Sequence, residues 1–112
     1  MAIDKSMLSG STMLMILSML EKKDMYGYEM VKELEIKSQK LFVLKEGTLY
    51  PILHNLEKQG KITSYIGEGN SGRKCKYYKI TSNGIKILNQ KKIEWKNFSL
   101  GVNNVLGVNL YE

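Results

Sequence analysis

Residues 45–60 constrain the fold of this chain of 112 residues most strongly, because their apolar side chains follow the period of an α-helix. Leu49, Ile52, Leu53 and Leu56 fall at i, i+3, i+4 and i+7, so all four lie on one stripe that faces a core. The glycine at residue 60 predicts the end of the helix. The opposite stripe carries Gly47, Tyr50, Pro51, His54 and Lys58. This segment predicts a short amphipathic helix whose polar face is either solvated or free to bind a partner.

Pro51 restricts where this helix begins. A proline inside a helix lacks an amide donor and crowds the carbonyl of the residue four positions earlier, which here is Gly47. Two interpretations remain open: Thr48 is the N-cap and Pro51 lies in the first turn, or the helix begins near Glu46 and Gly47 relieves the crowding. Both place the N-terminus between Glu46 and Thr48, where small residues let free amides approach a phosphate.

Two segments of alternating polarity follow, separated by a glycine-rich loop. Residues 62–66 and 73–80 predict two strands, and residues 67–72 predict the flexible connection of a hairpin. The cations of the second strand crowd the end nearest the loop, where their charges suit the neutralisation of phosphates; they are Arg73, Lys74 and Lys76. The alternative is an edge hairpin whose lysines keep the protein soluble and discourage strand pairing.

Two further helices are predicted before this segment. Residues 9–22 are apolar almost all the way round a helix, which indicates contacts on two sides. Residues 25–38 form a second helix with Asp24 as its cap, and residues 40–44 form a connector anchored by its apolar side chains. Three helices followed by a basic hairpin have the order of a winged helix-turn-helix, in which the helix near residues 46–58 is presented to a groove of DNA.

The C-terminal segment predicts one long helix that begins at Thr81 as N-cap and frays after about residue 105. Its apolar residues repeat every seven positions in two registers, and the expected interface consists of Leu88, Trp95, Phe98, Val102 and Val105. A helix this long on so small a protein leaves these side chains exposed unless a second copy covers them. We therefore predict a dimer; the alternative is that the helix folds back on its own domain.

The expected fold class is mainly α with a small β-hairpin, namely a winged helix-turn-helix plus one long C-terminal dimerisation helix. Residues 1–80 are the predicted DNA-binding domain, and residues 81–112 are the predicted dimerisation helix. A chain of this length supports one modest core, which favours an oligomer.

Composition favours a polyanionic partner over catalysis. Lysine and arginine total 17 against 11 acidic residues, a net charge of +6 that suits nucleic acid or an anionic membrane surface. His54 is the only histidine and Cys75 the only cysteine, so the sequence predicts no catalytic triad, zinc cluster or internal disulfide. We expect no enzyme activity, no cofactor and no metal. The interrupted apolar run near the N-terminus resembles neither a secretory signal nor a membrane span, so we expect a cytoplasmic protein without a membrane partner.

Several motifs occur in one order: MYGYEM at residues 25–30, EGTLYPIL at 46–53, LEKQGKI at 56–62 and RKCKYYKITSNG at 73–84. Together they resemble the PadR family of bacterial transcription regulators over about residues 8–100, and the short C-terminal part is similar to the smaller branch of that family. The resemblance implies a homodimeric winged-helix repressor of double-stranded DNA. Its recognition helix enters the major groove of an inverted-repeat operator, and its wing contacts the flanking backbone.

We predict which side chains contact DNA on this basis. Base edges are assigned to Thr48, Tyr50, Pro51 and His54, while Gly47 lets the helix N-terminus approach the backbone. Phosphate contacts are assigned to Tyr26, Lys45, Thr48, Arg73, Lys74 and Lys76. A different function remains open, because winged helices also serve as protein–protein docking modules without sequence-specific DNA binding. The basic hairpin and the net charge favour DNA.

The resemblance also implies a small-molecule effector. In multidrug-sensing members of the family, a tryptophan in the last helix lines a cavity at the dimer centre and stacks on flat aromatic drugs, and Trp95 lies at the matching place. All seven methionines lie within the first 30 residues, where they suit a cavity of variable shape or serve as ordinary core filler. The residues expected around a planar aromatic effector are Met7, Leu8, Leu14, Ser18, Trp95, Phe98 and Ser99.

Overall fold

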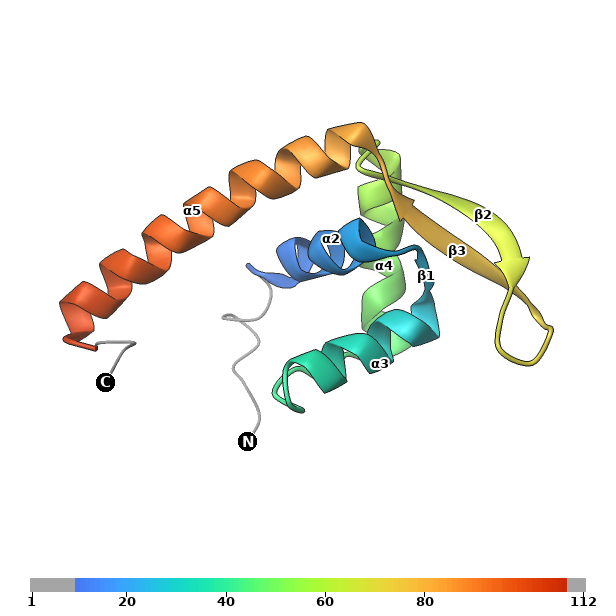
Figure 1. Ribbon diagram of the computed structural model, residues 1–112, viewed down its shortest axis with the longest axis horizontal. Coiled ribbons are helices and arrows are strands. Elements are labelled where there is room, and N and C mark those ends of the chain that lie inside the picture. Colours follow the sequence, from blue (N-terminus) through green and yellow to red (C-terminus); the bar gives the residue numbers. More distant parts are fainter. Residues whose placement is uncertain (1–9, 109–112) are drawn as a thin grey trace.

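The computed structural model describes residues 10–108. Along this range the elements are α2 (Thr12–Lys22), β1 (Met25–Tyr26), α3 (Gly27–Lys37), α4 (Glu46–Lys58), β2 (Ile62–Glu68), β3 (Lys74–Ile80) and α5 (Ser82–Leu106). The hairpin of β2 and β3 projects from one side of the helical body and α5 from the other (Figure 1). The predicted fold class, mainly α with a small antiparallel β-sheet, is confirmed.

The core lies between α2, α3, α4, the sheet and the first turns of α5. The predicted apolar stripe of α4 is confirmed, because Leu49, Leu53 and Leu56 are each at most 3% exposed. Ile16 and Leu17 of α2 are fully buried, as expected of a helix that is apolar around most of its circumference. The other members of the core are Met19, Leu20, Met25, Met30, Leu34, Leu44, Ile62, Tyr78 and Leu88.

The sheet has three strands in the order β1-β3-β2, and both strand pairs are antiparallel. β2 and β3 form the predicted hairpin, with Ile62 opposite Ile80. The prediction of a helix from residue 25 was wrong at its start, because residues 25–26 pair with Tyr78 and Tyr77 of β3, and α3 begins only at Gly27. The two residues of β1 are too few to show a strand period in the sequence.

The N-terminus of α3 is capped differently from the prediction. Tyr26 is the N-cap, and the Glu29 carboxylate accepts a hydrogen bond from the Tyr26 backbone amide at 3.2 Å. Asp24, the predicted cap, instead accepts a hydrogen bond from the Tyr65 hydroxyl at 2.7 Å. Asp24 therefore ties the hairpin to the segment before β1.

The start of α5 is joined tightly to the turn between α4 and β2. Thr81 caps the helix as predicted, since its Oγ1 accepts a hydrogen bond from the Gly84 amide at 3.0 Å. The same hydroxyl donates to the Gly60 carbonyl at 2.7 Å. A side chain at Gly84 would overlap the Lys61 carbonyl oxygen, so this approach of the helix to the turn requires glycine.

After its first turns α5 leaves the body. It extends past the other helices to its end at Leu106 (Figure 1). Gly107 follows in the left-handed conformation, with φ of 73°, which is a common way for a helix to end. The observed end lies next to the predicted fraying point at residue 105.

Candidate nucleic-acid interface

The exposed face of α4 carries most of the side chains that the sequence assigned to base contacts. Thr48, Pro51 and His54 are exposed, and the buried leucine stripe lies on the other side of the helix. Gly47 also faces open space, because a side-chain carbon added there meets nothing within 4 Å. The face combines a hydroxyl, an imidazole and a bare stretch of backbone, which are groups suited to hydrogen bonds in a DNA groove.

The N-terminus of α4 resolves the two interpretations of Pro51. The helix begins at Glu46 with Lys45 as N-cap, and the Lys45 carbonyl accepts the first backbone bonds from residues 48 and 49 at 3.0 Å. Pro51 therefore lies inside the helix, and Gly47 is the residue that its ring crowds. The amides of Glu46 and Gly47 precede the first intrahelical bond, so they remain available as outward donors. Lys45 is exposed beside them.

Tyr50 is only partly free to contact DNA. It is 45% exposed, and its hydroxyl lies against the backbone at Gly27, where an added side-chain carbon would be 2.7 Å away. Burial raises the pKa of the phenol, and the nearby Glu46 carboxylate raises it further. Tyr50 is therefore neutral at physiological pH. Its ring packs against the start of α3, and the rest of its surface is exposed.

The hairpin formed by residues 62–80, called the wing below, has cations in two different settings. Arg73 and Lys74 lie exposed at the tip, where the residues the structure describes offer them no ion pair. Lys76 lies closer to the body, and its Nζ is 3.7 Å from Oε1 of Glu57 on α4. The sequence placed all three cations in one group, whereas the structure separates the paired Lys76 from the two at the tip.

Three tyrosines, one from each strand, form a cluster on one face of the sheet, which sequence reasoning missed. The Tyr77 ring packs edge-on against Tyr26 with centroids 5.4 Å apart, and it stacks on Tyr65 at 5.6 Å. Gly67 makes room, since a side-chain carbon there would lie 2.8 Å from the Tyr77 ring. Tyr26, a predicted phosphate contact, is thus half-buried in this cluster. Alternation along β3 places Tyr77 on one face of the sheet but does not reveal its neighbours.

The hydroxyls of this cluster are held by the protein. The hydrogen bond from Tyr65 to the Asp24 carboxylate raises the pKa of the Tyr65 phenol, because the phenolate would repel that carboxylate. Partial burial raises the pKa of Tyr77, whose hydroxyl donates to the Glu68 carbonyl at 2.8 Å. Both tyrosines are therefore neutral donors that brace the wing.

The predicted effector residues divide between two grooves along α5. A groove of about 760 Å³ is lined by Leu14, Trp95 and Phe98, with Met13, Lys91 and Glu94 beside them. A second groove of about 350 Å³ lies next to Leu14 and Trp95 and adds Ser18 and Phe42. Ser99 lines neither groove, and its hydroxyl donates to the Lys96 carbonyl at 3.1 Å. Met7 and Leu8 lie outside the described residues.

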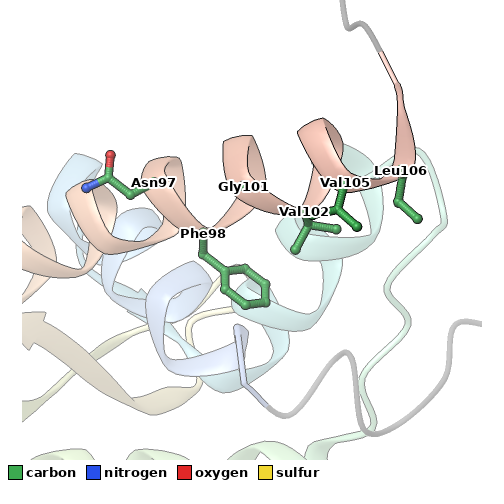
Figure 2. A pocket seen from close by; sticks show the side chains of 6 residues that line it. All are labelled: Asn97, Phe98, Gly101, Val102, Val105 and Leu106. Atoms are coloured by element: carbon green, nitrogen blue, oxygen red, sulfur yellow. The ribbon is translucent and has the colours of Figure 1, made fainter.

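The residues of α5 that were predicted to form the dimer interface fall into a buried group and an exposed group. Leu88 is fully buried within its own chain, so its assignment to a dimer interface is wrong: the first turns of α5 belong to the core. Further along, Phe98 and Val102 extend from one side of the helix, away from Asn97 (Figure 2). Together with Gly101, Val105 and Leu106 these residues border a shallow, almost entirely apolar hollow.

Comparison with known proteins identifies the family. The model of the transcriptional regulator PadR-like family matches residues 16–90. The chain belongs to this PadR-like family. Its structure is similar to a transcriptional regulator from Clostridium thermocellum, with TM-score 0.82 and 41% identity over 91% of this chain and 96% of that one. It is also similar to a PadR-like transcriptional regulator from Bacillus cereus, with the same TM-score of 0.82 and 32% identity over 93% of this chain and 99% of that one.

A third relative is the transcriptional regulator YqjI of Escherichia coli, which is 32% identical over 83 residues, or 74% of this chain and 38% of that protein. Membership of the PadR-like family makes this chain a DNA-binding regulator and not an enzyme. Among residues 10–108, His, Cys, Asp and Glu form no group of three or more that could hold a metal ion. No helix in the same range is long and apolar enough to cross a membrane.

Proposed function

We propose that this PadR-like protein is a dimeric transcriptional repressor that binds an inverted-repeat operator. Residues 1–80 form the unit that reads one half-site, and residues 81–112 join two copies. The protein works in the cytoplasm, where its DNA lies. The observation that carries this proposal is the apolar face of α5, which is buried at Leu88 and then continues, exposed, through Trp95, Phe98 and Val102.

The exposed apolar residues in the second half of α5 favour a dimer in which a second copy buries them. Trp95, Phe98, Val102 and Val105 lie within about three turns on one face, where a monomer would leave a contiguous apolar strip in water. The hollow beside Gly101 is bordered almost entirely by carbon, so it suits another apolar side chain (Figure 2). A two-fold axis through these helices brings the same residues of both copies together.

The arrangement of α4 and the wing supports the docking on DNA. The N-terminal half of α4 enters the major groove with Thr48, Pro51 and His54 toward base edges and with Tyr50 supporting the helix from α3. Lys45 and the free amides at residues 46 and 47 contact phosphate. Arg73 and Lys74 at the wing tip contact the flanking backbone. Two copies of this unit read the two halves of a symmetric operator.

A mobility-shift assay with the double-stranded DNA directly upstream of the protein's own gene tests this function. We expect a shifted complex that persists with excess random DNA. Arg73→Gln and Lys74→Gln each weaken binding to every duplex and reduce the slope of log affinity against log salt by about 1.8, because the dimer loses one phosphate contact in each of its two copies. His54→Ala instead changes which sequence is preferred. Absence of binding to any duplex would favour a protein docking module.

We further propose that a planar aromatic effector enters the groove between α2 and α5 and releases the operator. Trp95 borders both grooves and is half-exposed, so its ring offers a stacking surface. Trp95 is also the only tryptophan, so its fluorescence reports on this place alone. We expect planar aromatic compounds to quench it and to lower operator affinity together. No quenching across a chemically varied panel would leave Leu14 and the methionines as plain core.

A further inference from the structure

One carboxylate on the recognition helix α4 contacts both strands of the wing. Oε2 of Glu57 accepts a hydrogen bond from the Ser64 hydroxyl of β2 at 2.5 Å. Oε1 of the same group lies 3.7 Å from the Lys76 Nζ of β3. Ser64 pairs with Tyr78 and Lys76 with Ile66 across the ladder, so these contacts gather on the face of the wing that is turned toward α4.

This contact gives Lys76 a different role from the cations at the tip. Its ammonium also lies 5.5 Å from the centre of the Tyr78 ring, and Tyr78 is buried in the core. The side chain is therefore directed along the wing toward the body, and Glu57 compensates its charge. Arg73 and Lys74 have neither kind of partner among the described residues.

We propose that Glu57 is a positioning residue of the DNA interface. It fixes the wing relative to α4 and holds Lys76 away from the phosphates, so that the tip cations alone make the wing's backbone contacts. The proposal rests on the proposed docking of α4 and the wing on one duplex. A groove-reading helix and a backbone-binding wing must keep a constant separation, because any freedom between them has to be lost on binding.

A partly exposed ion pair such as that of Lys76 with Glu57 contributes little to folding stability, so DNA binding is the property that should respond. The experiment measures affinity for the operator duplex as a function of salt concentration. Lys74→Gln is expected to reduce the slope by about 1.8, because the dimer loses two phosphate contacts, whereas Lys76→Gln leaves it at the wild-type value. Glu57→Gln keeps an acceptor for Ser64 but releases Lys76. We therefore expect its slope to rise by up to about 1.8, because both copies release an ammonium group, and its affinity for random DNA to increase.

The double variant Glu57→Gln with Lys76→Gln provides the matched control. It restores the wild-type slope if the released ammonium is the cause of the rise, and a merely structural role of Glu57 does not predict that restoration. Glu57→Ala, which removes both contacts, is expected to lower the ratio of operator to random-DNA affinity as well. Thermal unfolding of each variant verifies that the fold is kept.

Two outcomes overturn the proposal in distinguishable ways. If Lys76→Gln reduces the slope as much as Lys74→Gln and Glu57→Gln changes nothing, Lys76 contacts phosphate and Glu57 does not restrain it. If Lys74→Gln and Arg73→Gln also leave the slope unchanged, the wing does not touch DNA, and the proposed docking fails together with this inference.

Discussion

The recognition helix α4 and the second half of α5 carry the same kind of apolar stripe, but only one of the two is covered. Leu53 of α4 is fully buried, whereas Phe98 and Val105 of α5 are 65% and 89% exposed. α4 has neighbours on its apolar side because the chain folds α3 and β2 against it. After Leu88, no described residue of α5 is buried. An apolar stripe therefore indicates that a helix face is buried in the functional protein. Whether its own chain or a second copy buries it depends on the fold.

The largest expected effect is on the dimer. Phe98→Glu removes an apolar contact worth about 1.5–3 kcal/mol per side chain, and a two-fold interface loses it twice. We expect dissociation to a monomer, measured by sedimentation. Ile93→Glu is the matched control: Ile93 is 64% exposed, much like Phe98, but it lies two residues before Trp95 and therefore on the other side of α5.

The assignment of the exposed α5 stripe to the dimer interface is wrong if Phe98→Glu and Ile93→Glu dissociate the dimer equally, or if neither does. In the first case charge alone would separate the copies, and in the second case the exposed face of α5 would not be the interface. Operator affinity should follow the same order, because a monomer reads only one half-site.

The next effect in size concerns the covered stripe of α4. Leu53→Ala leaves a cavity in the core, and we expect the free energy of unfolding to fall by about 2–5 kcal/mol. Denaturant unfolding measures this loss. It should remain at every protein concentration, whereas the effect of Phe98→Glu should disappear on dilution to concentrations at which the wild type also dissociates. A loss that itself vanished on dilution would place Leu53 at an interface.

The smallest expected effect separates the exposed face of α4 from its buried face. Gly47→Ala adds a methyl group to open space and should stabilise the helix by about 0.5–1 kcal/mol. The same methyl group should weaken operator binding, because it keeps the helix N-terminus from the phosphate. Unfolding and operator titration of one protein sample measure both. Unchanged or tighter DNA binding would show that α4 does not approach DNA at Gly47.

Local signals predicted the parts of the fold that depend on neighbours in the sequence. The α4 stripe and the Thr81 cap were predicted because helical period and capping act over a few residues. The strand β1 was missed because two residues show no period, and only pairing with the distant β3 defines it. Because β1 was missed, Asp24 was predicted to cap α3, whereas the N-cap is Tyr26.

In the candidate site, too, the features that depend on sequence neighbours could be predicted, and those that depend on tertiary packing could not. Exposure of Thr48 and His54 follows from the helical period of α4. The pairing of Lys76 with Glu57 does not follow from the sequence, because it depends on how the wing lies against α4. Leu88 was assigned to the dimer because a seven-residue repeat does not show where the body of the protein ends along α5.

The most direct test of the account is the mass of the protein, free and bound to DNA, measured by sedimentation on duplexes that carry either one half-site or the complete inverted repeat. We predict a free protein of twice the chain's mass and a complex of two chains on the complete repeat. Phe98→Glu should bind the single half-site as a monomer. A wild-type protein with the mass of one chain, bound singly to the complete repeat, would contradict the account.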